Sequence, residues 1–191
     1  MKSAIINSIR SVFVCVSVAF PAVAQETPET NVDAKRDWSV FRASTEPKEC
    51  WIVTIPAASE ATRNGQKVTP DRGDTLLMVT NRPGGNVQGE ISFKSGYPIK
   101  ENTTVNLRVG AASFEMFVEG EWAWPANPEE DQKVIAAMQR GASAIATAVS
   151  ERGTATVDTF SLLGFSAAFD SAVTSAGLRR CSRTSRRRAA P

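Results

Sequence analysis

The sequence predicts a mainly β protein, an antiparallel β-sandwich or barrel-like domain with two helices at about residues 127–140 and 165–176. The strands are predicted by short apolar runs that recur through the middle of the chain, separated by turns rich in Gly and Pro. The helices are predicted by apolar residues at helical spacing near the C-terminal end. A chain of 191 residues with 42% hydrophobic and 22% charged residues fits one globular domain.

The expected strands lie at 38–42, 50–55, 75–80, 88–93, 104–109, 113–124, 142–149 and 154–161. The strand at 113–124 shows the clearest alternation. One face is expected to carry Phe114, Met116, Val118, Trp122 and Trp124, and the other Glu115, Phe117, Glu119 and Glu121. Gly120 is expected to mark a bulge within this strand.

Both helices have clear start and stop signals. Asn127 is a capping residue, Pro128 suits the first helical position, and three acidic residues follow in the first turn. Calcium loops space their oxygen ligands around a turn, so the three consecutive acids predict a helix start and no metal site. Gly141 ends the first helix, and Gly177 ends the second.

The N-terminal segment predicts export. Lys2 and Arg10 precede a short apolar run, and an Ala-x-Ala pattern ends at Ala24. We expect residues 1–24 to be a signal peptide cleaved between Ala24 and Gln25, followed by a flexible lead-in at 25–36. A single domain is expected at 37–181 and a disordered Arg-rich tail at 182–191. The mature protein is expected in the periplasm, at the cell surface or secreted, without a transmembrane span.

Signal-peptide removal leaves two cysteines, Cys50 and Cys181. An even pair in an oxidising compartment favours a disulfide, which would tie the C-terminal region to an early strand.

The chain contains no histidine, which excludes Ser-His-Asp and Cys-His catalytic groups, histidine metal sites and histidine-ligated haem. No glycine pattern matches a phosphate-binding loop. The sequence therefore predicts a protein that is not an enzyme and uses no cofactor or metal.

Phe117, Glu119 and Glu121 on the outward strand face are the predicted contact surface for a partner. The alternative is that Glu119 and Glu121, about 7 Å apart on one strand face, form an acid–base pair. That pair would make the protein a periplasmic carboxylate-dependent glycan hydrolase.

Two further features carry alternatives. Four tryptophans (Trp38, Trp51, Trp122 and Trp124) suit a sugar-stacking platform or a packed core, and the core is expected. Six arginines and no acid lie within residues 179–191, whereas all 20 acidic residues lie between 25 and 178. The tail arginines Arg183, Arg186, Arg187 and Arg188 are expected to form a disordered, solvated end, and the alternative is that they bind phosphate groups of an anionic envelope surface or of nucleic acid. No sequence-specific nucleic-acid binding is predicted.

Several motifs resemble the invasion-associated locus B family of exported bacterial proteins across about residues 36–181. The motifs are Trp38-Ser39-Val40-Phe41, Glu49-Cys50-Trp51-Ile52-Val53, Arg72-Gly73-Asp74-Thr75-Leu76-Leu77, Gly120-Glu121-Trp122-Ala123-Trp124-Pro125 and Phe160-Ser161-Leu162-Leu163-Gly164-Phe165-Ser166-Ala167-Ala168. The resemblance implies a β-dominated exported domain with no established enzymatic activity, linked by the family name to host-cell invasion. This chain lacks the additional mid-domain cysteine pair of many members, and its arginine tail is unlike their short ending.

The predicted function is an exported, non-enzymatic envelope or surface protein that binds an unknown protein or envelope component. The alternatives are the glycan hydrolase and a structural envelope component without a host role.

Overall fold

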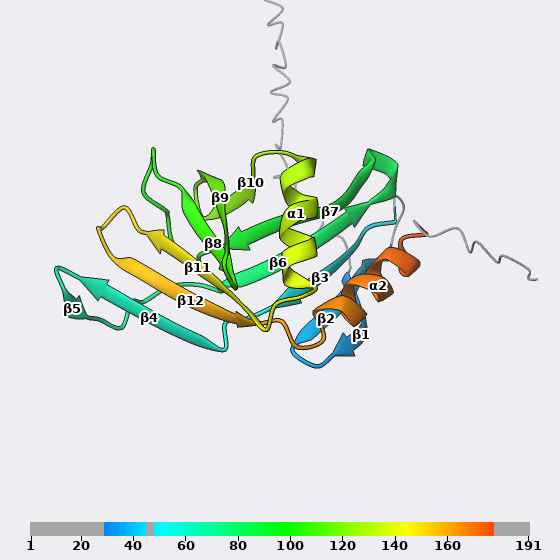
Figure 1. The fold of residues 1–191 in the computed structure, drawn as a ribbon, viewed down its shortest axis with the longest axis horizontal. Coiled ribbons are helices and arrows are strands. Elements are labelled where there is room, and N and C mark those ends of the chain that lie inside the picture. The colour runs from blue at the N-terminus through cyan, green and yellow to red at the C-terminus, as the bar shows by residue number, and fades with distance from the viewer. Residues whose placement is uncertain (1–28, 45–47, 178–191) are drawn as a thin grey trace, which may run out of the picture.

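A computed structural model describes residues 29–44 and 48–177. Within these residues the chain forms one antiparallel sheet of twelve strands and two α-helices (Figure 1). The predicted class, mainly antiparallel β with two helices, is confirmed. The sheet does not close into a barrel.

The strands pair in the order β1-β2-β3-β6-β7-β10-β9-β8-β11-β12-β4-β5. Their bounds are β1 Glu29–Lys35, β2 Trp38–Ala43, β3 Cys50–Thr54, β4 Ala58–Arg63, β5 Gln66–Lys67, β6 Leu76–Arg82, β7 Val87–Lys94, β8 Val105–Val109, β9 Ala112–Glu119, β10 Trp122–Pro125, β11 Ser143–Val149 and β12 Ala155–Ser161. A short 3-10 turn at Pro83–Gly85 joins β6 to β7.

The sheet folds over so that its two halves share one core. Phe93 on β7 and Phe160 on β12 meet edge to face with ring centroids 6.2 Å apart, although their strands are not neighbours. Trp38 on β2 also reaches β12, where its indole N–H donates to the carbonyl of Ser161 at 3.1 Å. These side chains are almost completely buried, so the core lies inside the fold of a single sheet.

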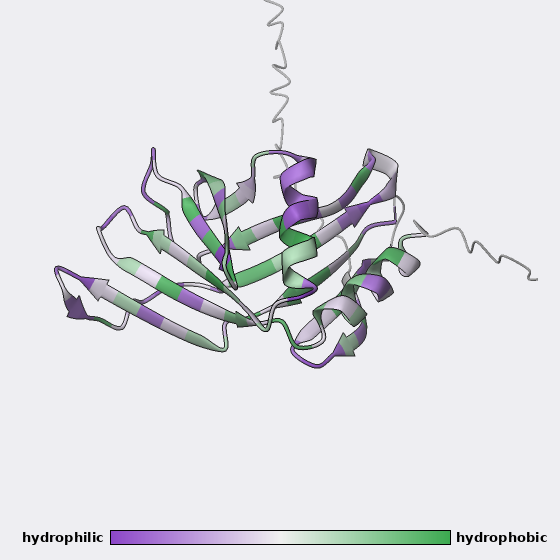
Figure 2. Cartoon of the chain, viewed as in Figure 1, coloured by the Kyte–Doolittle hydropathy of each residue, from purple (hydrophilic) through white to green (hydrophobic). Residues whose placement is uncertain are grey.

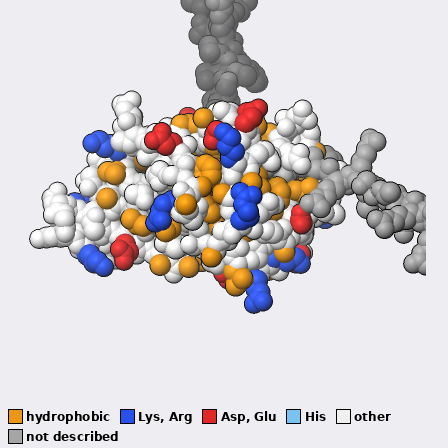
Figure 3. Space-filling model, viewed as in Figure 1, with side chains coloured by type: hydrophobic (Ala, Val, Ile, Leu, Met, Phe, Trp, Pro, Cys, Tyr) orange, Lys and Arg blue, Asp and Glu red, His pale blue; other side chains and the backbone are white. Residues whose placement is uncertain are grey.

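The two helices, α1 (Pro128–Met138) and α2 (Phe165–Ser175), lie within the predicted ranges. Both cover the same face of the sheet, α1 over β7 and α2 over β2 and β3 (Figure 1). Asn127 caps α1 as predicted, because its side-chain oxygen accepts the N–H of Glu130 at 2.9 Å. Figure 2 shows α1 with a hydrophilic first turn and a more hydrophobic second half. In Figure 3 hydrophobic side chains gather towards the middle of this face, with charged side chains scattered around them.

Glycine allows α2 to approach the β1–β2 turn. Gly164 has φ 94°, and a Cβ there would collide with the carbonyl of Lys35. Only glycine combines this backbone angle with this close contact.

The prediction of a flexible lead-in at 25–36 was wrong for its second half. Residues Glu29–Lys35 form the edge strand β1, which pairs along β2 with a register shift between Asn31 and Asp33. An edge strand is held by main-chain hydrogen bonds on one side only and needs no apolar alternation, so the periodicity gave no signal.

The prediction of one strand at 113–124 was also wrong. β9 and β10 form a hairpin, and Gly120 lies in its two-residue turn with φ 61°, not in a bulge. A second hairpin, β4–β5, was missed, because its strands contain mostly small and polar residues. Only its turn residues, Asn64 and Gly65 with positive φ, were visible in the sequence.

Cys50 at the start of β3 is completely buried and forms no disulfide within the described residues. Cys181 lies outside the described residues, so the bridge stays a prediction. α2 starts beside Trp38 and has Ser171 against Asp33 on β1, so it runs towards the end of the sheet where β3 begins. Gly177 follows at this end, four positions before Cys181 in the sequence.

We expect the oxidised protein to unfold at a higher temperature than its Cys50→Ser variant. Closing a loop longer than about 100 residues restricts the unfolded chain by up to roughly 5 kcal/mol. Thermal unfolding with and without reductant measures the difference, and an intact mass two hydrogens below that of the dithiol identifies the bond. Equal midpoints for oxidised and reduced wild-type protein would contradict the bridge. The reduced Cys50→Ser variant controls for the change of side chain.

Candidate functional site

A cavity of about 620 Å³ lies at the end of the sheet where β7 ends and β6 begins. We call it the Arg72 cavity. Its walls come from the end of β4, the segments 70–73 and 96–98, the β9–β10 turn and the β11–β12 turn. Backbone hydrogen bonds tie these segments to one another, including Gly73 N–H to Gly96 O at 2.8 Å and Glu151 N–H to Pro98 O at 3.1 Å. The cavity is therefore built from loops that hold each other in place.

Gly96 is required for one of these contacts. It has φ 75°, and a Cβ there would collide with the carbonyl of Gly73. Glycine at position 96 therefore allows the segment before β6 to lie directly against the segment after β7.

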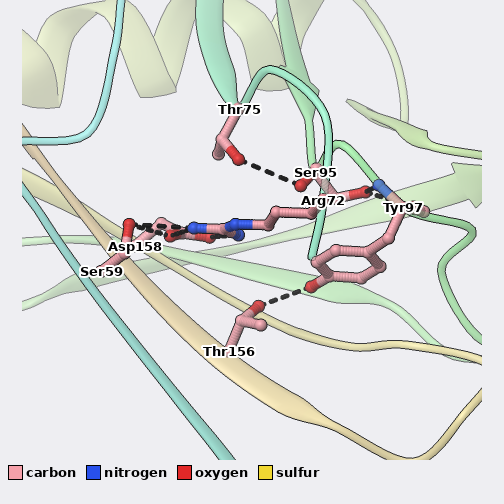
Figure 4. A network of polar contacts seen from close by, with 7 residues as sticks. All are labelled: Ser59, Arg72, Thr75, Ser95, Tyr97, Thr156 and Asp158. Atoms are coloured by element: carbon pink, nitrogen blue, oxygen red, sulfur yellow. Dashed lines mark hydrogen bonds and ion pairs between the residues drawn. The ribbon is translucent and has the colours of Figure 1, made fainter. Parts of the chain in front are cut away.

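The centre of the site is a buried ion pair between Arg72 and Asp158 (Figure 4). The guanidinium donates to both carboxylate oxygens, from Nη1 to Oδ2 at 3.0 Å and from Nη2 to Oδ1 at 2.6 Å. Ser59 adds a hydroxyl donor to Oδ1 at 2.6 Å. The Asp158 side chain is fully buried and that of Arg72 is 13% exposed, so the charges compensate each other inside the protein. This pairing with Asp158 raises the pKa of Arg72.

Tyr97 forms a further wall of the Arg72 cavity, and its hydroxyl points towards Thr156 on β12 (Figure 4). Its hydroxyl and that of Thr156 form a hydrogen bond at 2.5 Å, and burial raises the pKa of the phenol. Ser95 connects the segment 96–98 to the β9–β10 turn, because its hydroxyl donates to the carbonyls of Tyr97 and Glu121 at 2.5 and 3.1 Å.

Charged groups of both signs line the Arg72 cavity. Arg63 donates to the hydroxyl of Thr154 at 2.8 and 2.6 Å. Five lining residues form no ion pair with any described residue: Arg63, Arg152, Asp71, Glu121 and Glu151. The cavity thus presents cations and carboxylates whose charges the described part of the protein does not neutralise.

The structure separates the three residues predicted to share a contact surface. Glu121 lines the Arg72 cavity, whereas Phe117 and Glu119 line a smaller hollow of about 370 Å³ beside Trp124. The β9–β10 turn lies between the two glutamates, so they are not neighbours on one strand face. The geometric premise of the glycan-hydrolase alternative, a carboxylate pair on one strand, was therefore wrong.

The chain reversal at the β9–β10 hairpin also places the side chains of Trp122 and Trp124 on the outward face of these strands. Opposite residues of a β-ladder share a face, and Trp124 pairs with Phe117 while Trp122 pairs with Glu119. Ala123 is buried instead, and both tryptophans are half-buried. Trp51 on β3 is also half-buried and stacks on Phe41. The expected core position holds for Trp38 alone among the four.

Asp131 in the first turn of α1 borders the hollow beside Trp124. Its side chain inserts between β7 and β10, where Oδ1 accepts the N–H of Ile91 at 2.9 Å. The residue is 8% exposed, and burial raises the pKa of the carboxyl to about 6, with the nearby Glu90 charge adding to the rise. Sequence reasoning missed Asp131 because it explained the three consecutive acids by helix-start electrostatics.

The remaining predicted positions lie outside the described residues. These are Ala24 and Gln25 at the expected cleavage site, Cys181, and the tail residues Arg183, Arg186, Arg187 and Arg188. In the described ranges, no group of three or more Cys, Asp or Glu side chains has a geometry that could hold a metal ion. None of the described helices has the length and apolar character to cross a membrane.

Comparison with models of protein families, with curated proteins and with solved structures finds no match to this chain. The resemblance to the invasion-associated locus B family therefore stays a prediction from the sequence motifs.

We expect Asp158→Asn to destabilise the protein by roughly 3–5 kcal/mol, because it leaves a largely buried guanidinium without a counter-charge. Urea denaturation measures the change. Lys67→Ala, which removes one partner of the exposed Lys67–Glu60 pair, is the matched control and should cost at most about 1 kcal/mol. Similar losses for the two variants would show that the buried pair has no special structural role.

We expect Asp131→Asn to change the pH dependence of stability. The folded pKa of about 6 lies above the ordinary value of 3.8, so the folded state binds the proton more tightly than the unfolded chain. Wild-type stability should therefore fall as the pH rises from about 4 to 6 and then level off, whereas the variant lacks this fall. The measurement is the free energy of unfolding at several pH values, with the exposed Glu129→Gln as control. A constant difference between wild type and Asp131→Asn across this range would contradict the prediction.

Proposed function

We propose that this chain is an exported, non-enzymatic binding protein of the cell envelope that takes its ligand in the Arg72 cavity. The carrying observation is the set of five charged lining residues without an ion-pair partner among the described residues, two cationic and three anionic. A ligand that satisfies both signs carries an anionic and a cationic group close together. A peptide segment has this chemistry in its termini and side chains.

The rigidity of the cavity supports binding. Its walls are cross-linked by backbone hydrogen bonds, and the Arg72–Asp158 pair fixes β12 against the segment before β6. A preformed site loses little conformational entropy when a ligand enters, which favours affinity. Tyr97 adds an aromatic wall with a hydroxyl, suited to contact with a peptide backbone.

The location in the envelope rests on the signal-peptide pattern of residues 1–24, and the absence of histidine-based catalysis rests on the composition. The proposal concerns binding alone. A role in host-cell invasion is implied only by the family resemblance.

Calorimetric titration of the purified protein with a set of short peptides, each bearing free termini and at least one charged side chain, tests this proposal. We expect at least one peptide to bind, and Arg152→Ala or Glu121→Gln to weaken that binding by about tenfold, the loss expected for a charge-assisted hydrogen bond. Arg108→Ala is the matched control, because Arg108 is exposed on β8 and does not line the cavity.

The two cavity variants should unfold at the same temperature as the wild type, because neither side chain pairs with a described residue. Absence of binding across the whole peptide set would overturn the peptide proposal. Binding that all three variants weaken equally would place the ligand outside the Arg72 cavity.

A further inference from the structure

The hollow beside Trp124, which we call the Trp124 hollow, has its own lining but flanks the same β9–β10 hairpin as the Arg72 cavity, since Glu119 lines the hollow and Glu121 lines the cavity. It forms where β10 leaves β7, because the two strands pair only at Trp122 and Ala123. The first turn of α1 closes it from the helix-covered face. Its volume is about 370 Å³, and its lining includes three carboxylates and no Lys or Arg: Glu90, Glu119 and Asp131.

Two of these carboxylates have unused acceptor capacity. Glu90 is paired with Arg82 at 2.6 Å, but Glu119 forms no ion pair with a described residue. Asp131 is more than nine-tenths buried, and its Oδ2 accepts no hydrogen bond from the described residues. A cation in the hollow would meet both groups.

The aromatic side chains that line the hollow, Phe117 and Trp124, also favour a cation. Phe117 stacks on Trp124 with centroids 5.5 Å apart and planes 26° apart, and Trp124 stacks on Trp122 at 6.2 Å and 20°. The row already carries one cation, since the Lys94 ammonium lies 5.8 Å from the Trp122 ring centre. Aromatic faces attract cations, and the planar guanidinium both stacks on a ring and donates to carboxylates as a fork.

The chain itself contains such groups close by. α2 runs towards the end of the sheet where Cys50 on β3 pairs with Asn81 on β6, and Asn81 pairs in turn with Gln88 on β7. α1 begins beside the middle of β7, where Asp131 accepts the N–H of Ile91, and Gln132 in its second turn donates to the carbonyl of Gln88 at 2.9 Å. The described fold therefore ends, at Gly177, towards the end of the sheet that adjoins the first two turns of α1.

The segment is long enough to reach the hollow. Arg183 to Arg188 lie six to eleven positions beyond Gly177, which corresponds to an extended reach of roughly 20–36 Å at about 3.3 Å per residue. With the predicted bridge to Cys50 formed, they lie two to seven positions beyond Cys181, a reach of roughly 7–23 Å from the start of β3. A domain of this size has a radius of gyration of about 15 Å, so this length is enough to pass around the edge of the sheet.

We propose that the Trp124 hollow binds an arginine of this chain's own C-terminal tail. The guanidinium stacks on Trp124 and pairs with Glu119 and Asp131. The body carries all 20 acidic residues and the tail carries six arginines, so the long-range electrostatics also favour this contact. An anionic envelope surface is the alternative partner of the same arginines, so the hollow would compete with such a surface for the tail.

The test uses the full mature chain with Arg183, Arg186, Arg187 and Arg188 all replaced by Gln, which keeps the tail but removes these four charges. A peptide of residues 182–191, labelled at its C-terminus, is titrated with this protein and followed by fluorescence anisotropy. We expect saturable binding. Trp124→Ala or Glu119→Gln should weaken it by about tenfold. Two matched controls, Trp51→Ala and Glu115→Gln, alter side chains that do not line the hollow and should leave binding unchanged.

Two further arms identify the occupant. The chain with its native tail should bind the labelled peptide at least about tenfold more weakly, because a tethered segment competes at high effective concentration. A peptide with its arginines replaced by lysine should bind more weakly, because an ammonium cannot stack or fork.

Each arm has an outcome that overturns the proposal. These are no saturable binding, binding insensitive to Trp124→Ala and Glu119→Gln, and equal affinity for the lysine peptide, which indicates a diffuse ionic contact. Equal peptide affinity of the native-tail chain overturns the assignment to the tail. The native-tail chain could also bind the peptide more weakly only at high protein concentration. That result assigns the hollow to the tail of a second copy and overturns the assignment to the chain's own tail.

Discussion

A single continuous sheet that buries one face against itself determines where every other feature of this protein lies. The two helices pack mainly on β7 and on β2 and β3, so they cover only part of one face of the twelve-stranded sheet. The sheet therefore folds over, bringing Phe93 against Phe160, and the helices cover the part of that face left open (Figure 1). The fold-over gathers loops that are distant in sequence at one end of the sheet, and those loops form the Arg72 cavity.

The Arg72–Asp158 pair follows from the same constraint. Asp158 is on β12 and is fully buried, and a carboxylate in such a position needs a counter-charge and hydrogen-bond donors to offset the loss of water. Arg72 supplies the charge from the segment before β6, across the opening between the two halves of the sheet. The pair thus joins the halves at a point where β-ladder hydrogen bonds are absent. The pair matters for the relative position of the two halves as much as for stability, because a buried ion pair adds little free energy of folding compared with apolar side chains packed in its place.

The sequence was a good guide wherever a local pattern had one physical cause. Asn127-Pro128 followed by acids predicted the start of α1, and the apolar spacing from Phe165 predicted α2. It failed where a long-range contact decides the structure. Trp122 and Trp124 were assigned to the core because alternation across 113–124 was read as one strand, and a two-residue turn at Gly120 reverses the face. β1 and β4 carry too few apolar residues to be recognised alone, since their stability comes from the strands they pair with.

The candidate site was harder to predict than the fold for the same reason. Glu121 was predicted in one contact surface with Phe117 and Glu119, but it lines the Arg72 cavity while those two residues line the Trp124 hollow. Arg72 and Asp158 are 86 positions apart in the chain, and no local pattern connects them. Asp131 was visible as a helix-start acid, yet its environment depends on β10 leaving β7 after two residue pairs.

The distribution of charge links the two candidate binding regions. The Arg72 cavity offers both signs of charge, so with the proposed binding function it would discriminate among ligands by the spacing of their charged groups. The charged groups that line the Trp124 hollow are all carboxylates and stand beside two aromatic rings, so the hollow would select cations, and the chain's own tail is a concentrated source of them. Asp131 connects this selection to pH, because its pKa of about 6 means that its carboxyl loses much of its negative charge in mildly acidic surroundings. A tail held there would be released by acidification or by a strongly anionic surface, and either event would free the arginines beside the β9–β10 hairpin, whose turn residue Glu121 lines the Arg72 cavity.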